Sequence, residues 1–234
     1  MSLPVTAMIF AAGFGTRMGE RCATRPKALL EVGGAPLIQH ALRHAADAGV
    51  AEVVVNLHYR AEQVQARLTG WARPRLRFSP ERPEILDTGG GLRAAGPLLG
   101  EDPVVALNSD AVWQGENPLA PLEAAWRGAE MDALLLLVPR SQALCHPGTG
   151  DFAMAPDGRL TRRGEAAEAP YVYTGAQILR TAGLEAFAPG AFSLNVLWDR
   201  MLAAGRLYGA VYPGRWVDVG TGAGLAMADR LLRA

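Results

Sequence analysis

Lysine is almost absent from this 234-residue chain: of its 23 basic residues, 22 are arginines and only Lys27 is a lysine. Arginine carries a wide planar guanidinium, whereas lysine carries a compact ammonium on a thin stem. A site between phosphate oxygens could therefore accept lysine and exclude arginine. Chance survival of one lysine in an arginine-rich sequence is the alternative, and the count alone does not separate the two.

The chain also has few cysteines, no long apolar run and no net charge. Two cysteines, Cys22 and Cys145, cannot form a disulfide framework and are expected to be reduced thiols. No apolar run approaches the roughly 20 residues that span a bilayer, and the N-terminus lacks the features of a signal peptide. We therefore expect a cytoplasmic protein without a membrane partner. The 23 basic and 23 acidic residues balance, so nothing favours a nucleic acid partner.

Apolar segments of strand length alternate with helical patterns over the first 140 residues. The pattern predicts strands at 5–10, 52–57, 75–79, 103–108 and 133–138, and helices at 36–48, 61–68, 92–99 and 119–127. Continuous apolar strands that alternate with helices are typical of a parallel sheet covered on both faces. We predict an α/β fold with a Rossmann-like, doubly wound, mostly parallel sheet in a single domain, 1–234.

The second half is less regular at first. The range 140–190 has short strand patterns near Phe152 and Leu160 and at 171–178, and we interpret it as a small inserted β or lid region. Regular patterns return with a helix at 194–204 and strands at 208–212 and 216–220. Thr221 can then cap a last helix that runs to the C-terminus.

A glycine-rich segment, Ala11-Ala12-Gly13-Phe14-Gly15-Thr16-Arg17-Met18, follows the first predicted strand. Small residues at this place let backbone N–H groups face an anion, although a tight turn without a ligand is the alternative. A Walker loop is excluded because no Gly-Lys-Ser/Thr follows. The dinucleotide fingerprint is excluded because Met18 stands at its third glycine, and the second strand ends without an acidic residue.

Four ordered segments together resemble the sugar-1-phosphate nucleotidyltransferase family. The glycine-rich segment is followed, ten residues after Arg17, by Pro26-Lys27. Leu86-Asp87-Thr88-Gly89-Gly90-Gly91 resembles the family's second glycine-rich loop. Asn108-Ser109-Asp110 and Trp216-Val217-Asp218-Val219-Gly220-Thr221 resemble its two metal-binding segments. Relatives that make the molybdenum cofactor place the lysine only a few residues after the arginine, so the ten-residue gap favours a sugar phosphate.

The resemblance implies roles for individual residues. Arg17 and Lys27 would be catalytic, holding the triphosphate while a sugar phosphate attacks its α-phosphorus and pyrophosphate leaves. Asp110 and Asp218 would bind Mg²⁺, and Asn108 and Asp151 would bind the sugar phosphate. The implied nucleotide-binding residues are Ala11, Ala12, Gly13, Gly15, Thr16, Arg17, Lys27, Gly89 and Gly90. Asn108, Asp110, Asp151 and Asp218 could instead be ordinary turn residues at strand ends.

Within the family, the sequence is most similar to the members that transfer a uridylyl group from UTP to N-acetylmuramate 1-phosphate in cell-wall recycling. Ser79-Pro80-Glu81, Gly150-Asp151-Phe152 and Phe192-Ser193-Leu194 support this branch, whereas Phe14 stands where many members have a polar residue. GTP with mannose 1-phosphate, or dTTP or UTP with glucose 1-phosphate, are alternative substrates. A non-catalytic nucleotide-sugar sensor or regulatory subunit is a different class. The oligomeric state stays open.

Overall fold

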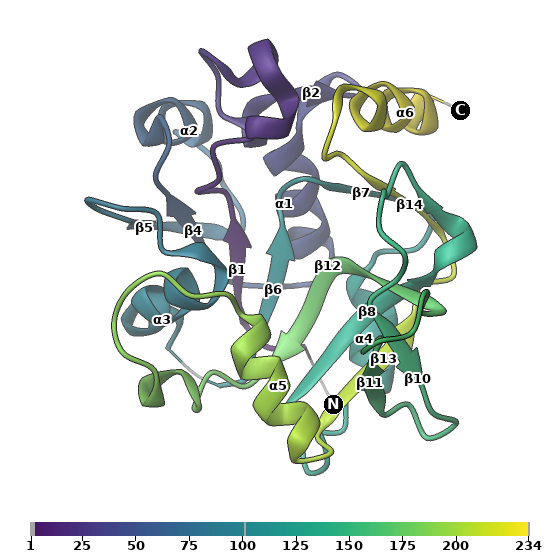
Figure 1. The fold of residues 1–234 in the computed structure, drawn as a ribbon. Helices are drawn as coiled ribbons and strands as arrows, with labels where there is room; N and C mark the ends of the chain where they lie inside the picture. The colour runs from purple at the N-terminus through teal and green to yellow at the C-terminus, as the bar shows by residue number, and fades with distance from the viewer. Residues whose placement is uncertain (1–2, 101, 234) are drawn as a thin grey trace.

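A nine-stranded sheet forms the centre of the computed structural model, which describes residues 3–100 and 102–233. Its path is β11-β10-β12-β6-β1-β4-β5, and β8 and β13 continue it from β12 (Figure 1). The strands are β1 Thr6–Phe10, β4 Glu52–Leu57, β5 Arg75–Pro80, β6 Val104–Asn108, β8 Ala133–Pro139, β10 Phe152–Met154, β11 Leu160–Arg162, β12 Tyr171–Leu179 and β13 Leu207–Val211.

The pairing confirms a mostly parallel, doubly wound sheet. β1 is parallel to both β4 and β6, β4 is parallel to β5, and β13 is parallel to β8. The chain runs from β1 through β4 to β5 and then returns to place β6 on the other side of β1. This reversal is a topological switch point, and ligands of such sheets bind there, outside the carboxyl ends of the strands.

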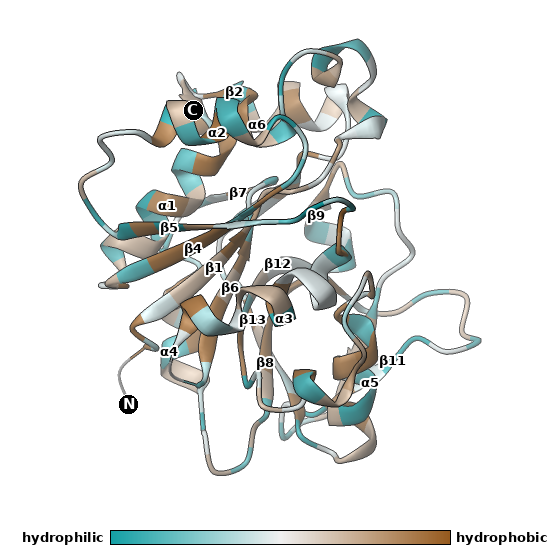
Figure 2. Ribbon diagram, turned by 90° about the vertical axis from the view of Figure 1, so that its left-hand side faces the viewer, coloured by the Kyte–Doolittle hydropathy of each residue, from teal (hydrophilic) through white to brown (hydrophobic). Residues whose placement is uncertain are grey.

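Helices cover both faces because alternate residues of each strand point to opposite sides. In β1, Ala7 and Ile9 join one apolar cluster and Met8 joins another. The first cluster includes α1 Leu37–Asp47, α2 Ala61–Leu68 and α4 Leu119–Ala125; the second includes α3 Asp87–Leu99 and α5 Asn195–Ala203. In Figure 2 the central strands are largely brown, whereas the helices around them carry hydrophilic stretches.

A small sheet and the last helix complete the chain. Strand β14, Arg215–Asp218, lies between β7 (Ala111–Gln114) and β9 (Ala143–Leu144). Helix α6 spans Gly222–Arg233, and Ala234 lies outside the described residues. Gly224 N–H donates to Thr221 Oγ1 over 3.3 Å, which confirms the predicted N-cap. The remaining short elements are the β2–β3 hairpin (Glu31–Val32 and Ala35–Pro36) and the 3₁₀ helices η1 Thr16–Cys22, η2 Lys27–Leu29, η3 Arg140–Gln142 and η4 Leu184–Ala186.

The second glycine-rich segment corrects the expected boundary of its helix. We expected a loop up to Gly91, but α3 begins at Asp87. Three successive glycines weaken a helix by about 1 kcal/mol each relative to alanine, which is why the sequence indicates a loop. In the fold, Gly89 and Gly90 N–H groups both donate to the carbonyl of Phe192. This distant carbonyl satisfies two free donors of the first turn and supports the helix.

The range 140–190 is also more closely integrated than expected. Strand β12 lies inside the main sheet, antiparallel to both β6 and β8. Only β10 and β11 extend from it as an antiparallel hairpin. A shift of register between Tyr173 and Gln177 interrupts β12, and this bulge breaks the regular alternation that would mark a central strand. None of the helices in the described ranges has the length and apolarity to cross a membrane.

Candidate active site

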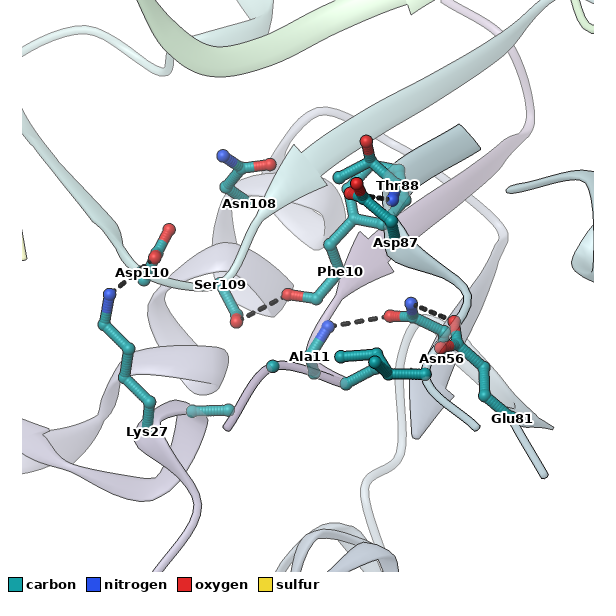
Figure 3. A pocket seen from close by; sticks show the side chains of 14 residues that line it. Phe10, Ala11, Lys27, Asn56, Glu81, Asp87, Thr88, Asn108, Ser109 and Asp110 are labelled. Atoms are coloured by element: carbon teal, nitrogen blue, oxygen red, sulfur yellow. Dashed lines mark hydrogen bonds and ion pairs between the residues drawn. The ribbon is translucent and has the colours of Figure 1, made fainter. Parts of the chain in front are cut away.

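A pocket opens at the switch point, where β1 and β6 end (Figure 3). We call it the switch-point pocket. The first glycine-rich segment enters it from β1, and the segment after β6 enters it from the other side. Its lining residues are Phe10, Ala11, Ala12, Gly13, Lys27, Ala28, Asn56, Glu81, Ile85, Asp87, Thr88, Asn108, Ser109 and Asp110. Ligand binding at this place agrees with the rule for open α/β sheets.

Lys27 and Asp110 are joined directly in this pocket. Lys27 Nζ donates to Asp110 Oδ2 over 2.6 Å, and the lysine side chain is only 12% exposed. Lys27 begins η2, whereas Asp110 lies in the turn between β6 and β7, so the fold brings together residues 83 positions apart. An ammonium and a carboxylate held in contact at a pocket wall supply a donor for phosphate oxygens and an acceptor for a cation.

The conformation of Gly15 explains how the loop reaches Lys27. Gly15 has a φ of +66°, which favours glycine, and a Cβ there would lie 2.8 Å from Cys22 Sγ and 3.0 Å from Lys27 Cβ. A Cβ on Gly13 would meet no atom within 4 Å. A glycine is therefore required at position 15 by the close packing and by the positive φ. At position 13 the absence of a side chain leaves open space in the pocket. Burial raises the pKa of the Cys22 thiol, so this cysteine is not activated as a nucleophile.

Asp218 lies beside Arg17 and His146. A Cβ built on Gly220 would be 3.0 Å from Asp218 Oδ1 and 3.1 Å from an Arg17 Nη1, so both groups face the same small space. Asp218 Oδ2 lies 3.4 Å from His146 Nδ1. Asp218 is the last residue of β14, and in the small sheet it pairs with Ala111, the residue that follows Asp110. Asp218 thus lies across from the neighbour of Asp110, although the two carboxylate residues are far apart in the chain.

These two carboxylates fit a Mg²⁺ ion that also binds phosphate. The described residues contain no group of three or more His, Cys, Asp or Glu side chains arranged for a metal. Mg²⁺ prefers oxygen ligands and is usually held by one or two carboxylates together with substrate phosphates. Asp110 and Asp218 supply that number, whereas a structural zinc site would need more protein ligands.

A chain of buried hydrogen bonds links the two glycine-rich segments. Ala11 N–H donates to Asn56 Oδ1 and Asn56 Nδ2 donates to Glu81 Oε1 (Figure 3), and Leu86 N–H donates to Glu81 Oε2, each over 2.7 Å. Glu81 is only 1% exposed. Sequence reasoning missed these contacts, since Asn56 is merely the residue before the last of β4 and Glu81 merely follows β5. They fix the start of the first glycine-rich segment relative to the residues that precede α3.

A second pocket adjoins the first and shares Phe10, Asp87, Thr88 and Asn108 with it. We call it the aromatic pocket. Its other lining residues come from β10–β12, the loop before β10 and the region of α5: Asp151, Phe152, Arg162, Tyr173, Gln177, Ser193, Leu194, Asn195 and Trp198. The structure therefore places Asn108 and Asp151, the two expected sugar-binding residues, in one pocket.

The aromatic wall of this pocket is held by its own polar contacts. Trp198 Nε1 donates to Gln177 Oε1 over 3.0 Å, and Gln177 Nε2 donates to Tyr173 Oη over 2.9 Å. The rings of Tyr173 and Trp198 meet edge to face at 5.0 Å. Asp151 Oδ2 accepts from Tyr173 N–H over 2.9 Å. A rigid aromatic wall beside carboxylate and amide groups suits a ligand with apolar faces and hydroxyl edges, such as a sugar.

The expected nucleotide-binding residues divide into three groups. Ala11, Ala12, Gly13 and Lys27 line the switch-point pocket. Gly15, Thr16 and Arg17 are not among its lining residues, although a Cβ on Gly15 would lie 3.0 Å from Lys27 Cβ. Gly89 and Gly90 lie behind the wall: a Cβ on Gly89 would be 2.5 Å from the Phe192 ring, and one on Gly90 would be 2.2 Å from the Gly190 carbonyl. Close packing is sufficient to explain those two glycines.

Comparison with known proteins gives one family. The model of the MobA-like NTP transferase domain matches residues 7–169. N-acetylmuramate alpha-1-phosphate uridylyltransferase of Caulobacter vibrioides is 41% identical over 99% of this chain and 98% of that protein. The protein of that name from Neisseria meningitidis serogroup B is 31% identical over 97% and 98%. The structure of the inositol-1-phosphate CTP transferase from T. maritima matches with a TM-score of 0.77, 18% identity and coverage of 100% and 96%, which shows the shared fold.

Proposed function

We propose a specific reaction for this chain, which belongs to the sugar-1-phosphate nucleotidyltransferases and carries their MobA-like NTP transferase domain. The chain is an enzyme that transfers a nucleotidyl group to a sugar phosphate. Its proposed substrates are UTP and N-acetylmuramate 1-phosphate, and its products are UDP-N-acetylmuramate and pyrophosphate. The observation that carries this choice is the 41% identity to the uridylyltransferase of Caulobacter vibrioides over almost the whole of both chains.

The two adjoining pockets support this assignment. UTP would occupy the switch-point pocket with its phosphates toward Gly13 and Lys27, and the sugar would occupy the aromatic pocket. Asn108 lies in the wall that the pockets share, so the two phosphates would meet near it. Ligands held in adjoining pockets react as if at high local concentration, which lowers the barrier without a chemical group from the protein.

The proposed step needs charge stabilisation more than acid–base chemistry. An oxygen of the sugar phosphate forms a bond to the α-phosphorus, and the bond from that phosphorus to the pyrophosphate oxygen breaks. The attacking oxygen is already anionic, so no general base is required. Arg17 would hold the β- and γ-phosphates with its fork, and Lys27 would hold the α-phosphate as a point charge. Both cations oppose the repulsion between two anionic substrates.

Asp110 and Asp218 would hold Mg²⁺ in this scheme. The ion supplies charge neutralisation and orientation for the triphosphate when bound. Asp110 would share its carboxylate between Lys27 and the metal, since only Oδ2 is engaged by the lysine. His146 would orient Asp218 through its contact with Oδ2. We also propose that the reaction takes place in the cytoplasm, where nucleoside triphosphates are available, and that its product serves cell-wall recycling.

Pyrophosphate release tests the proposal directly. UTP, GTP, dTTP and CTP would each be combined with N-acetylmuramate, N-acetylglucosamine, glucose and mannose 1-phosphates, with Mg²⁺ and with EDTA. We expect the highest kcat/KM for UTP with N-acetylmuramate 1-phosphate, and no release with EDTA. Preference for GTP with mannose 1-phosphate would contradict the substrates but keep the reaction class. No release from any pair would favour a sensor.

A further inference from the structure

We propose that Arg162 is the residue that selects the acidic sugar, by binding the carboxylate of the lactyl ether of N-acetylmuramate 1-phosphate. This inference rests on the proposed function and deepens it. N-acetylmuramate differs from N-acetylglucosamine only by that lactyl ether on the ring. Glucose, mannose and N-acetylglucosamine 1-phosphates have no carboxylate. A pocket that prefers the acid therefore needs a group that attracts this one additional negative charge.

Arg162 is the one cationic side chain among the described residues that line the aromatic pocket. The same lining includes two carboxylates, Asp87 and Asp151. Carboxylates accept hydrogen bonds from sugar hydroxyls, but they repel a ligand carboxylate. Without Arg162 the pocket would thus favour neutral sugars. With it, the pocket has a positive pole at the end of β11.

The guanidinium is held in place by rings and by one ion pair. Its central carbon lies 5.1 Å from the centre of the Phe152 ring and 5.7 Å from the centre of a ring of Trp198. Arg162 Nε and Nη2 donate to Asp199 Oδ1 over 3.0 and 2.8 Å. Both contacts fix a side chain that would otherwise lose rotamer entropy on binding, so the donor is preorganised.

The same contacts leave donors for a ligand. Nη2 has a further, longer contact with the carbonyl of Asn195 at 3.3 Å, and Nη1 has no hydrogen bond to any residue that the structure describes. Asp199 uses a single oxygen and is 59% exposed, so water weakens its hold on the arginine charge. The arginine side chain is 33% exposed. Nη1 can therefore reach a carboxylate in the pocket without breaking the pair with Asp199.

A comparison of the acid with its methyl ester tests this assignment. The ester keeps the shape of the lactyl group and removes its charge. With the wild-type enzyme and UTP, we expect kcat/KM for the acid to exceed that for the ester about 10- to 100-fold, the contribution of one charge-assisted hydrogen bond. In Arg162→Gln the acid should lose that factor, while the ester and N-acetylglucosamine 1-phosphate change less than about threefold.

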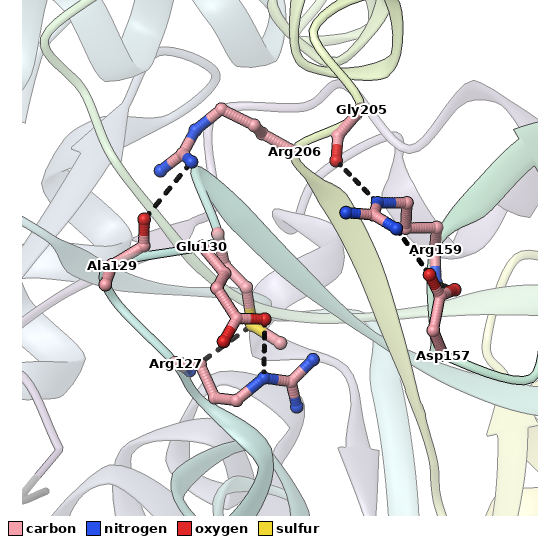
Figure 4. A network of polar contacts seen from close by, with 8 residues as sticks. Arg127, Ala129, Glu130, Asp157, Arg159, Gly205 and Arg206 are labelled. Atoms are coloured by element: carbon pink, nitrogen blue, oxygen red, sulfur yellow. Dashed lines mark hydrogen bonds and ion pairs between the residues drawn. The ribbon is translucent and has the colours of Figure 1, made fainter.

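Two further variants separate recognition from folding. Arg159 is a matched control, because it also lies over an aromatic ring, Tyr208, and pairs with a neighbouring aspartate, Asp157, outside both pockets (Figure 4). Arg159→Gln should keep the ratio of acid to ester. Asp199→Asn removes the charge of this ion pair, but its amide oxygen can still accept from Arg162 Nε and Nη2 and hold the guanidinium in place, so it should also keep the ratio or increase it.

Each outcome has a definite meaning. Equal losses for acid, ester and N-acetylglucosamine 1-phosphate in Arg162→Gln would show that the arginine is structural or binds the phosphate, and would overturn the inference. An unchanged ratio would overturn it too, as would loss of the ratio in Asp199→Asn. Wild-type activity on the acid together with any of these results leaves the proposed function standing. A wild-type enzyme inactive on the acid contradicts both.

Discussion

The two pockets are built in different ways. The switch-point pocket is formed mainly by segments that directly follow parallel strands, and its charged side chains are Lys27 and the carboxylates Glu81, Asp87 and Asp110. The aromatic pocket is formed by side chains from a hairpin, a bulged strand and two helices, and its wall is largely aromatic. The comparison teaches that contiguous motifs supply most residues of the proposed phosphate site, whereas the proposed sugar site is enclosed by side chains that only the complete fold brings together.

Asn108 and Thr88 stand between the two pockets, and each is held by a distant segment. A Cβ on Gly175, in the bulge of β12, would lie 2.9 Å from Asn108 Cβ, so a glycine there leaves room for the asparagine. Thr88 Oγ1 accepts from Leu194 N–H over 2.9 Å. Substitutions in the switch-point pocket should therefore lower activity with every sugar phosphate. Substitutions in the aromatic pocket should lower activity to an extent that depends on the sugar.

The largest expected effect is the loss of a proposed metal ligand. Asp218→Asn should lower kcat by about 10²- to 10³-fold with every sugar phosphate, because a neutral amide attracts Mg²⁺ weakly. Asp151→Asn is the matched change in the aromatic pocket, and its amide oxygen can still accept from Tyr173 N–H. It should alter the KM for the sugar phosphate and not the KM for UTP. Similar losses in both variants for all sugars would break the division between the pockets.

Substitution of the single lysine should have the second largest effect on kcat. Lys27→Arg conserves the charge, but the wide guanidinium does not fit beside Gly15 and Asp110, so kcat should fall on the order of tenfold or more. Steady-state rates at saturating UTP and sugar phosphate would measure this. A wild-type rate would show that only the charge at position 27 matters.

The glycines provide a third test, in which stability and binding separate. Gly90→Ala would place a Cβ 2.2 Å from a backbone carbonyl, so the melting temperature should fall by about 4 °C or more. Gly13→Ala has free space, and its melting temperature should change by less than about 1 °C. Its KM for UTP should rise about tenfold if phosphate approaches that backbone. An unchanged KM would remove Gly13 from the nucleotide site.

The smallest effect concerns pH and lies outside both pockets. Burial, with a contribution from the nearby His40, lowers the pKa of His44 to about 4, and its ring contacts Trp113 edge to face. An unfolded histidine binds a proton below about pH 6.5, so stability is complete above that pH and falls as the pH decreases toward 4.

Thermal denaturation between pH 7 and 4 would measure this linkage. The wild-type melting temperature should fall about 3 °C further than that of His44→Gln over this range. Equal slopes in the two proteins would show that the pockets or other groups dominate the pH dependence of folding.

Much of the fold follows from local pattern, and the exceptions have physical causes. The predicted bounds of β4 and α2 agree with the structure, and those of β1 and α1 differ by a residue at one or both ends. The start of α3 was wrong because Phe192, about a hundred positions away, supplies its first acceptor. A strand was predicted at 171–178, but its place between β6 and β8 was missed, because a local pattern does not show which strands it pairs with. In α3, propensity yields to tertiary contacts.

The site divides along the same line. Lys27, Asp110 and the first glycine segment belong to contiguous motifs, and the structure brings them to one pocket. His146 and Arg162 were missed because none of the recognised motifs contains them, and the role of Glu81 was missed although its segment was recognised. His146 meets Asp218 across 72 positions, and Arg162 meets Asp199 across 37.

The contact between Lys27 and Asp110 also indicates that the site forms late in folding. Contacts between residues far apart in sequence must first offset the entropy of closing a long loop, and they form slowly. The contact spans 83 positions, and Asp218 joins from a strand that pairs with both β7 and β9. A partly folded chain with only β1 to β5 in place would hold the first glycine-rich segment without Asp110 or Asp218. Recovery of activity during refolding should therefore report the last tertiary steps, later than recovery of secondary structure.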